Sequence, residues 1–286
     1  MRCGRVAFIG EPNVGKSSLL NALVGENVSI VTDMPGTTRE EIRGVLNDDG
    51  FQIVFLDTPG MGKSKTGLDR FMNKSISAAH ASADVIVFVL DAANFRGAEK
   101  IGNFTKPVVV AVNKTDKTNF EKLYPKLALL DASKTAAIVP VSAKTGENLD
   151  ALVAEIVKLL PEGEKVFGDD EFTGQPLRKM AAEIIRGELI NRLAKEVPHG
   201  LAVSVADWHE TAREIQIRAE IIVEKQNHKP IVIGRRGALL KDVGIAARAQ
   251  IETLTEKHVR LETRVFVREG WKDKKSVLDE LGYVKK

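Results

Sequence analysis

Cysteine, tryptophan, tyrosine and long apolar runs are scarce in this chain of 286 residues. The single cysteine, Cys3, excludes an internal disulfide and fits a reducing cytoplasm. The longest apolar stretches, such as Val85 to Leu90, are far shorter than the ~18 residues that a bilayer span needs. No apolar signal segment precedes the first apolar run. We therefore expect a cytoplasmic protein.

The chain also has little net charge, only +3, but this charge is unevenly distributed. Residues 1–165 hold 20 basic and 20 acidic side chains, whereas residues 166–286 hold 22 and 19. Between Lys225 and Lys275 there are 13 basic and 6 acidic residues, a local net charge of +7. Such an excess suits a polyanion. On charge alone, a solvated basic face without a partner is the alternative.

Up to about residue 160, apolar strands alternate with helical patterns, which predicts an α/β domain with a doubly wound, mostly parallel sheet. The turn sequence Asp48-Asp49-Gly50 predicts a hairpin and hence one antiparallel edge. Strands are expected at 5–9, 53–57, 85–90, 107–112 and 137–141, and helices at 16–24, 68–82, 119–130 and 148–160.

After Pro161 the sequence becomes acidic and aperiodic, and then a different pattern begins. We place a first domain at 1–165, a linker at 166–177 and a second domain at 178–286. The second pattern has the order α-β-β-α-α-β-α, which predicts a smaller α+β domain. Its elements are expected at 177–196, 201–207, 214–224, a helical region ending at 257, 258–268, and a short helix from about 274.

The most specific motif is the run Gly-Glu-Pro-Asn-Val-Gly-Lys-Ser, a complete phosphate-binding loop between a predicted strand and a predicted helix. Its glycines let backbone N–H groups turn toward phosphate oxygens, and the helix N-terminus favours negative charge. Lys16 is expected to reach the β- and γ-phosphates, and the Ser17 hydroxyl to bind Mg²⁺. The expected nucleotide contacts here are Gly10, Glu11, Pro12, Asn13, Val14, Gly15, Lys16, Ser17 and Ser18.

A second motif, Asn113-Lys114-Thr115-Asp116, indicates guanine rather than adenine. An aspartate carboxylate can accept two adjacent hydrogen bonds from the N1–H and N2–H₂ groups of guanine, a pair that adenine lacks. Asn113 and Lys114 would brace the loop and cover the base. A backbone N–H within Ser142-Ala143-Lys144 suits the guanine O6. Alone, the Asn-Lys-x-Asp run is as often an ordinary turn, but its position after a phosphate loop favours nucleotide binding.

Two further segments predict the rest of a nucleotide site. Asp57-Thr58-Pro59-Gly60 ends a predicted strand, so Asp57 can hold Mg²⁺ through a water and the Gly60 N–H can contact the γ-phosphate. The loop Pro35-Gly36-Thr37-Thr38 offers a further hydroxyl to Mg²⁺, and Thr38 is preferred to Thr37. For this loop in isolation, an ordinary polar turn is the alternative.

In the basic region, Gly234-Arg235-Arg236-Gly237 lies between two predicted helices. A G-x-x-G loop lets two backbones approach closely, and its arginines add charge, which predicts binding of single-stranded RNA of about four nucleotides. A helix-connecting turn is the alternative for the four residues alone. No DNA ligand is expected. The expected RNA contacts are Ile231, Ile233, Gly234, Arg235, Arg236, Gly237 and Lys241.

Together these motifs resemble the Era-type GTPases, translation-factor-related P-loop GTPases with a C-terminal KH domain of type II. The resemblance covers essentially the whole chain, including Val-Ile-Gly-Arg-Arg-Gly-Ala and the closing Gly270-Trp271. It implies slow hydrolysis of GTP to GDP, binding near the 3′ end of 16S rRNA and a role in assembling the 30S subunit. It also implies a weak peripheral association with the inner face of the cell membrane. The segment from Asp91 to Pro107 is shorter than in the family, which bears on a local helix and not on the site.

The resemblance also bears on catalysis. Met61 stands where Ras-like proteins carry a glutamine, and a thioether cannot orient water, so another device is needed. In related proteins Asn13 marks a potassium site, although it could equally brace the loop. The implied cofactors are Mg²⁺ and K⁺, and the implied catalytic residues are Lys16, Thr38, Gly60 and Asn13. We expect the GTP or GDP state to control RNA binding. The alternatives are an RNA-binding module with a mainly structural GTPase domain, or a membrane- or division-linked GTPase.

Overall fold

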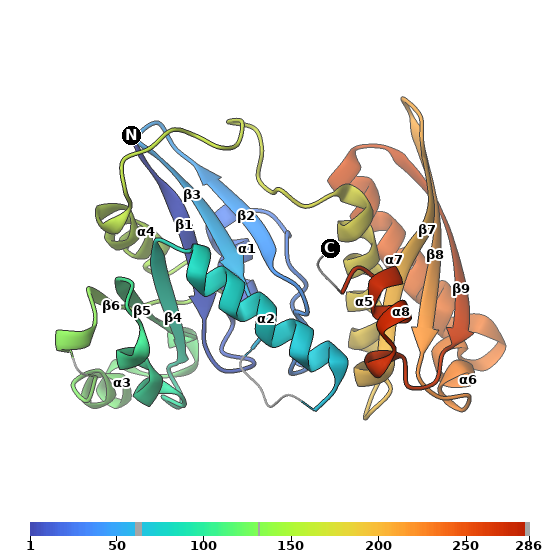
Figure 1. Ribbon diagram of the computed structural model, residues 1–286, viewed down its shortest axis with the longest axis horizontal. Helices are drawn as coiled ribbons and strands as arrows, with labels where there is room; N and C mark the ends of the chain where they lie inside the picture. The colour runs from blue at the N-terminus through green and yellow to red at the C-terminus, as the bar shows by residue number, and fades with distance from the viewer. Residues whose placement is uncertain (61–64, 131, 284–286) are drawn as a thin grey trace. The chain divides into compact units, whose positions relative to one another are not determined.

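The structure is a computed structural model that describes residues 1–60, 65–130 and 132–283. Its contacts divide the chain into two compact units (Figure 1). The first unit comprises Met1–Val31, Pro35–Ser64 and Met72–Gly174. The second unit comprises Gln175–Lys286 together with Thr32–Met34 and Lys65–Phe71.

The first unit is built on a six-stranded sheet with the order β2-β3-β1-β4-β5-β6. Its strands β2 and β3 are antiparallel, and every other neighbouring pair is parallel, as the sequence predicted. The strands are β1 (Arg2–Ile9), β2 (Ile42–Asn47), β3 (Phe51–Asp57), β4 (Val85–Asp91), β5 (Val108–Asn113) and β6 (Ala137–Pro140).

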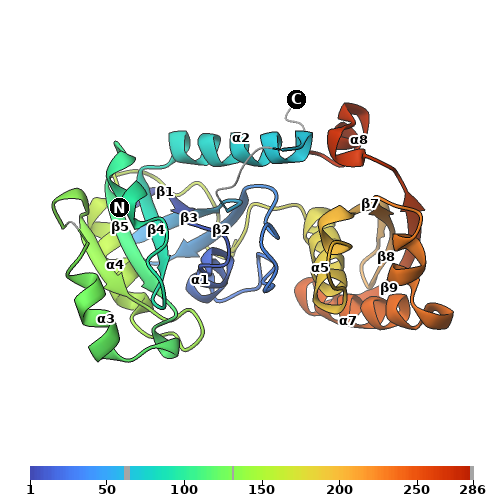
Figure 2. The ribbon, with the colours of Figure 1, turned by 90° about the horizontal axis from the view of Figure 1, so that it is seen from below.

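Helices cover both faces of this sheet, which confirms the doubly wound class (Figure 2). One face carries α1 (Lys16–Val24) and α4 (Leu149–Leu159). The other carries α2 (Gly67–Ser82) and α3 (Phe120–Leu127). The β4 strand is apolar throughout because its alternate side chains enter the two different cores. The carboxyl ends of β1, β3, β4 and β5 meet at one edge, where open α/β sheets bind ligands.

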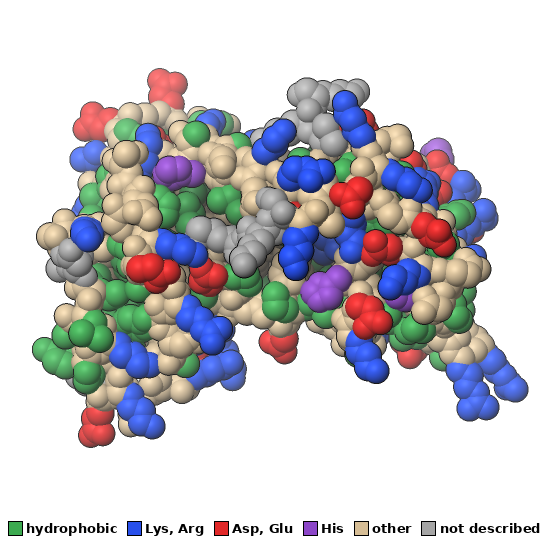
Figure 3. All heavy atoms as spheres, turned by 60° about the horizontal axis from the view of Figure 1, so that its bottom comes forward, with side chains coloured by type: hydrophobic (Ala, Val, Ile, Leu, Met, Phe, Trp, Pro, Cys, Tyr) green, Lys and Arg blue, Asp and Glu red, His purple; other side chains and the backbone are tan. Residues whose placement is uncertain are grey.

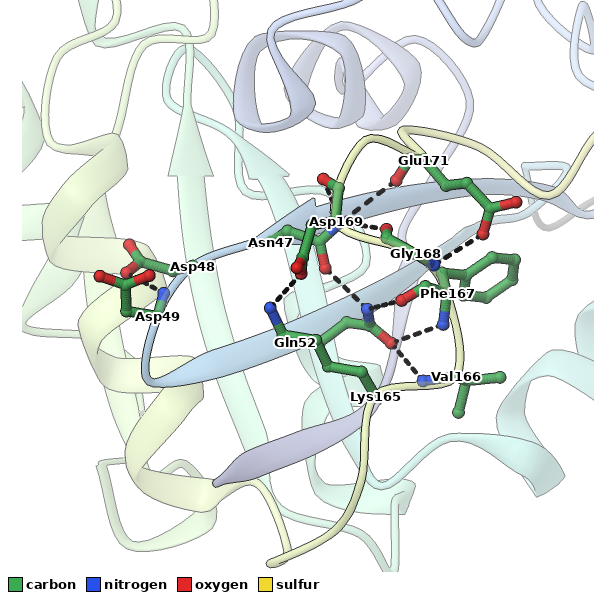
Figure 4. Close-up of polar contacts among 10 residues, drawn as sticks. All are labelled: Asn47, Asp48, Asp49, Gln52, Lys165, Val166, Phe167, Gly168, Asp169 and Glu171. Atoms are coloured by element: carbon green, nitrogen blue, oxygen red, sulfur yellow. Dashed lines mark hydrogen bonds and ion pairs between the residues drawn. The ribbon is translucent and has the colours of Figure 1, made fainter.

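The acidic stretch after the last helix of this unit is irregular but extensively hydrogen-bonded (Figure 4). We call residues 165–173 the strap. The side chain of Gln52 on β3 accepts from the N–H of Val166 at 2.7 Å and donates to the carbonyl of Phe167 at 2.8 Å. The side chain of Asn47 donates to three strap carbonyls, those of Gly168, Asp169 and Glu171. This stretch lacks periodicity, yet it is fixed to the edge of the sheet.

The strap continues along β2 beyond these two side chains. The Val45 N–H donates to the Phe172 carbonyl at 2.9 Å, and the Thr173 hydroxyl donates to the Arg43 carbonyl at 2.6 Å. These contacts cover part of an edge strand whose polar groups would otherwise be open to solvent or to another chain.

The second unit is an α+β fold on the three-stranded sheet β7-β8-β9, with β7 antiparallel and β9 parallel to β8. The order α-β-β-α-α-β-α is confirmed. The elements are α5 (Leu177–Arg192), β7 (Leu201–Glu210), β8 (Glu214–Val223), α6 (His228–Ile233), α7 (Ala238–Thr255), β9 (His258–Val267) and α8 (Lys275–Glu280).

Some boundaries differ from the predicted ones. The α5 helix ends at Arg192 rather than 196, and Lys195 then takes a left-handed conformation with φ 58°. Trp271 is fully buried and donates from its indole to the Gly200 carbonyl at 3.0 Å, so it packs inside the second unit.

Short 3₁₀ turns complete the two units. The segment after β4 contains one of them, η1. They are η1 (Ala98–Asn103), η2 (Thr115–Lys117), η3 (Ala132–Lys134), η4 (Pro198–Gly200), η5 (Arg235–Gly237) and η6 (Trp271–Asp273). Within the described ranges, no helix has both the length and the apolar character needed to cross a membrane.

Candidate functional sites

The phosphate-loop motif lies between β1 and α1, at the predicted ligand-binding edge of the sheet. A Cβ atom on Gly10 would lie 2.4 Å from the Val89 carbonyl oxygen, which no side chain permits. Gly15 has φ 94°, and a Cβ atom there would lie 2.3 Å from the Asn113 amide nitrogen. Both glycines are therefore required by the close approach of the loop to β4 and β5.

Lys16 is the first residue of α1 and is only 6% exposed. Its ammonium donates to the carbonyls of Gly10 at 3.2 Å and Glu11 at 3.1 Å. Burial lowers the pKa of Lys16, and the carboxylates of Asp57 and Glu11 partly oppose this effect. The loop thus holds a cation at its centre, as binding of a phosphate requires.

A buried carboxylate with three hydroxyls lies at the end of β3. Asp57 is fully buried, and its Oδ2 accepts from Ser17 at 2.6 Å, Ser29 at 2.9 Å and Thr38 at 3.5 Å. The Ser17 and Thr38 hydroxyls lie 3.0 Å apart. Burial raises the pKa of Asp57, while its hydrogen bonds and Lys16 act against that rise. The Asp57 Oδ1 is buried and has no hydrogen-bond partner in the part of the chain that the structure describes.

This Asp57 cluster brings together three predicted metal-site residues and one that sequence reasoning missed. Thr38 lies within hydrogen-bond distance of Ser17, in keeping with the preference for Thr38 over Thr37. Ser29 was not singled out because a lone serine in a polar loop carries no motif signal. Only the folded chain brings it to Asp57.

Asn113 connects the phosphate loop to the predicted base-binding loop. Its side chain is 1% exposed, donates to the Val14 carbonyl at 3.0 Å and accepts from the Ala143 N–H at 3.0 Å. Lys114 forms an ion pair with Asp91 at 2.8 Å and also donates to the Asn13 carbonyl. The Asn113 amide and the Lys114 ammonium thus connect the predicted base-binding loop to the phosphate loop, to the loop at Ala143 and to Asp91 at the end of β4.

Asp116 itself is exposed, and its Oδ1 accepts from the buried Ser142 hydroxyl at 2.8 Å. Lys144 is exposed two residues beyond Ser142. The structure therefore places the two predicted base-recognition motifs side by side, with the Asp116 carboxylate oriented by Ser142.

The remaining predicted residues border the phosphate loop. A Cβ atom on Gly60 would lie 3.0 Å from the Pro12 Cα atom, so this segment passes directly against the loop. Asn13 is exposed and takes a left-handed conformation with φ 63°. Ser18 is half-buried in the first turn of α1. Met61 lies outside the described residues.

In the second unit, the G-x-x-G motif connects α6 to α7 through η5. Gly234 has φ 76°, and a Cβ atom there would lie 2.7 Å from the Leu239 Cβ atom. Arg236 and Gly237 are also left-handed, with φ 53° and 80°. Ile231 is 48% exposed, whereas Ile233 packs on the core. The backbone therefore turns sharply at this loop, and both arginine side chains are exposed.

Charge pairing separates two parts of this unit. The face of the molecule in Figure 3 mixes basic and acidic side chains, so net charge alone does not locate a binding surface. On β9 the cations are neutralised: Arg260 pairs with Glu214 at 3.0 Å, and Arg264 pairs with Glu262 at 2.8 Å. Residues 225–255 contain α6, η5 and α7, and we call them the α6–η5–α7 region. In contrast to β9, the described acidic groups form no ion pair with the cations of this region, which are Lys225, Lys229, Arg235, Arg236, Lys241 and Arg248.

Comparison with known proteins accounts for both units. The family of 50S ribosome-binding GTPases matches residues 5–114, and the KH domain family matches residues 196–272. GTPase Era of Pseudomonas fluorescens is 39% identical over 290 residues, which cover 99% of this chain and 97% of that protein. GTPase Era of Alkaliphilus metalliredigens is 40% identical over 291 residues and 99% of both chains. The chain belongs to the Era family of GTPases.

Two solved Era structures match the whole of this chain at 39% identity, and each is covered completely. One is a point variant of Aquifex aeolicus Era bound to GDP·AlF₄⁻, with a TM-score of 0.95. The other is Era in complex with MgGDPNP and nucleotides 1506–1542 of 16S ribosomal RNA, with a TM-score of 0.93. The predicted fold, the GTPase activity and the KH domain are thereby confirmed.

Mg²⁺ accompanies GDPNP in that solved Era complex, and the Asp57 cluster fits this cation. The cluster offers only oxygen atoms, from one carboxylate and three hydroxyls, which are the donors that a hard divalent cation prefers. The partnerless, buried Asp57 Oδ1 is a ready acceptor for a metal-bound water, since no described group occupies it.

Proposed function

We propose that this Era-family GTPase binds single-stranded RNA near the 3′ end of 16S rRNA and acts in assembly of the 30S subunit. The proposal depends on one observation in the α6–η5–α7 region. A G-x-x-G loop occurs there together with six cations, and none of these cations forms an ion pair with a described acidic group. The 16S rRNA fragment in the solved Era complex supports this choice of RNA. The proposed contacts are Ile231, Ile233, Gly234, Arg235, Arg236, Gly237 and Lys241.

In the proposed nucleotide site, the phosphate loop and Lys16 bind the phosphates, and Asp116 selects guanine. Ser17 and Thr38 would hold Mg²⁺ directly and Asp57 would hold it through a water. When bound, Mg²⁺ neutralises charge on the β- and γ-phosphate oxygens. The Gly60 N–H would contact the γ-phosphate, and its closeness to the phosphate loop supports this role. The other proposed contacts are Gly10, Glu11, Pro12, Asn13, Val14, Gly15, Ser18, Asn113, Lys114, Ser142, Ala143 and Lys144.

We further assign GTP hydrolysis to residues 1–165 and RNA binding to residues 178–286, with 166–177 as the connection between them. K⁺ at Asn13 is the proposed aid to hydrolysis, because a cation can offset charge on the β/γ oxygens. Equal hydrolysis rates in sodium and potassium buffers would refute this assignment. The proposed location is the cytoplasm, with weak binding to the inner face of the membrane.

The RNA assignment is tested by charge reversal at the loop. A variant with Arg235→Glu and Arg236→Glu should lose binding to an RNA that matches the 3′ end of 16S rRNA by about 100-fold or more. Its basal GTP hydrolysis should stay within a few-fold of the parent rate. Arg260→Glu with Arg264→Glu changes the net charge equally on β9, where both arginines are already paired, and is the matched control. Equal losses in both double variants would indicate a general charge effect and refute a site at the loop.

A further inference from the structure

Ser29 occupies a position in the nucleotide unit that the proposed roles do not explain. It lies in the loop that follows α1, is 6% exposed, and donates its hydroxyl to the Asp57 Oδ2 at 2.9 Å. Ser17 and Thr38, the other two hydroxyls at this oxygen, already have a proposed role as metal ligands. Ser29 has none, although it is buried, whereas Ser17 and Thr38 are half-buried.

The position of Ser29 is fixed by a side chain of α1. The Asn21 amide donates to the Ser29 carbonyl at 2.8 Å, and the Ser29 N–H donates to the Asn21 Oδ1 at 2.9 Å. Asn21 lies one helical turn after Ser17, so the helix that carries the metal-site serine also carries the group that holds Ser29. The neighbouring Val28 is 5% exposed and packs in the core of the unit.

This arrangement divides the two oxygens of Asp57 between two tasks. The Oδ2 accepts the hydroxyl hydrogen bonds, whereas Oδ1 is buried and has no described hydrogen-bond partner. A carboxylate can rotate about its Cβ–Cγ bond, which would exchange the two oxygens. A hydrogen bond from a residue that is not itself a ligand opposes this rotation in every state of the site.

We propose that Ser29, held by Asn21, is a positioning residue that orients the Asp57 carboxylate for the water shell of Mg²⁺. The inference rests on the proposed metal site. It adds that two residues outside the recognised motifs set the affinity of that site for the metal. Loss of an outer hydrogen bond of this kind typically weakens metal affinity by about 10–100-fold.

The test is release of a fluorescent GDP from the full-length chain at a series of free Mg²⁺ concentrations. Ser29→Ala should raise the Mg²⁺ concentration that half-maximally slows release by about tenfold. Release in EDTA should remain unchanged, because the phosphate and base contacts are intact. Asn21→Ala should give the same shift for a different reason. The Ser29 hydroxyl is still present, but Asn21 no longer fixes its position. Ser77→Ala, which removes an exposed hydroxyl on α2, is the control and should behave as the parent.

Two results would overturn the proposal. One is an unchanged Mg²⁺ midpoint in both Ser29→Ala and Asn21→Ala. The other is faster release in EDTA by the same factor, which would mean that the pair supports the loop and not the metal site. If the parent chain itself showed no Mg²⁺ dependence, the proposed metal site would fail as well. Thermal unfolding in EDTA identifies a variant that does not fold, in which case the other variant decides.

Discussion

At the scale of single residues, the nucleotide unit buries two ionisable side chains of opposite charge, Lys16 and Asp57. Burial lowers the pKa of Lys16 and raises the pKa of Asp57, so each group is shifted toward its neutral form. Such shifts, centred on a phosphate-loop motif, are typical of sites that are completed by a charged ligand. A phosphate would complement the ammonium, and a hydrated Mg²⁺ would complement the carboxylate. The same two residues therefore explain why nucleotide and metal are expected to bind together.

Asp116 is predicted to select guanine over other bases, and a substitution at this single residue tests that prediction. In Asp116→Asn, the new amide N–H₂ would face the donors of guanine but could donate to the O2 of xanthine. The amide oxygen can still accept from N1–H, so one hydrogen bond to a charged acceptor is lost, worth roughly 1.5–3 kcal/mol, and GDP binding should weaken by at least about tenfold. Affinities for GDP and XDP, measured by calorimetry, should then be reversed in order. Ser142→Ala is the matched control, because it only removes the hydroxyl that orients Asp116 and should keep the preference for GDP.

At the scale of elements, the strap is expected to stabilise the edge of the nucleotide-unit sheet. Gln52 is 1% exposed and makes four hydrogen bonds, to Asn47, to both backbone groups of Phe167 and to the Val166 N–H. Gln52→Ala should therefore cost the unit about 1–3 kcal/mol of unfolding free energy. It should also speed proteolytic cleavage within residues 165–173. Gln216→Ala, which removes an exposed amide on β8, should change neither. Undiminished protection of the strap in Gln52→Ala would contradict this role.

The terminal helix of the second unit gives a prediction with a pH dependence. Arg268 at the end of β9 donates twice to Glu280 of α8, and this hydrogen bonding holds the pKa of Glu280 below its usual value. A lowered pKa means that the pair stabilises the folded state above the ordinary pKa and that this contribution is lost as the pH falls. Glu280→Gln should speed hydrogen exchange of the α8 amides near pH 7, by no more than about fivefold for so exposed a pair.

The difference should vanish only when the pH falls below the lowered pKa of Glu280 in the folded chain, because both chains are then neutral at this position. Glu269→Gln changes a nearby carboxylate without a described ion pair and should not alter exchange in α8. A difference between Glu280→Gln and the parent that persists at low pH would mean that the helix is held by something other than this charge.

How far the sequence predicts these elements depends on how local their signals are. The strands and the two sheets were predictable because β4 and β5 are apolar throughout and the turn Asp48-Asp49-Gly50 specifies a hairpin. The phosphate loop was predictable because its glycines are required by the close approach of its backbone to neighbouring strands. Each of these signals lies within a few consecutive residues.

What could not be predicted depends on contacts between distant residues. Ser29 and Asp57 are far apart in the chain, and neither the serine nor its partner Asn21 belongs to a motif. The strap lacks hydrophobic periodicity because polar side chains of other strands hold it through its backbone, and backbone groups leave no trace in the sequence. The charge pairing on β9 is similar, since composition cannot show which of the many arginines face a carboxylate.

At the scale of the whole molecule, the GTP or GDP state is expected to control RNA binding. If GTP favours a state of the chain that holds RNA more tightly, RNA must increase the affinity for a GTP analogue relative to GDP by the same factor. Coupling of this kind is typically about 5–150-fold. Both ratios can be measured on one preparation, by titrating RNA in the presence of each nucleotide and by titrating each nucleotide in the presence of RNA.

This measurement distinguishes the two interpretations of the GTPase unit, one in which its nucleotide controls RNA binding and one in which the unit is mainly structural. A nucleotide-controlled RNA-binding protein should give equal ratios well above one, whereas a mainly structural GTPase unit should give ratios of one, because a ligand that binds both states alike shifts neither. Asp116→Asn supplies an internal control: the coupling should follow xanthine nucleotides in that variant, since only the identity of the bound base has changed. Coupling that still followed guanine nucleotides would mean that the controlling nucleotide does not bind at Asp116, and the assignment of the site would have to be revised together with the mechanism.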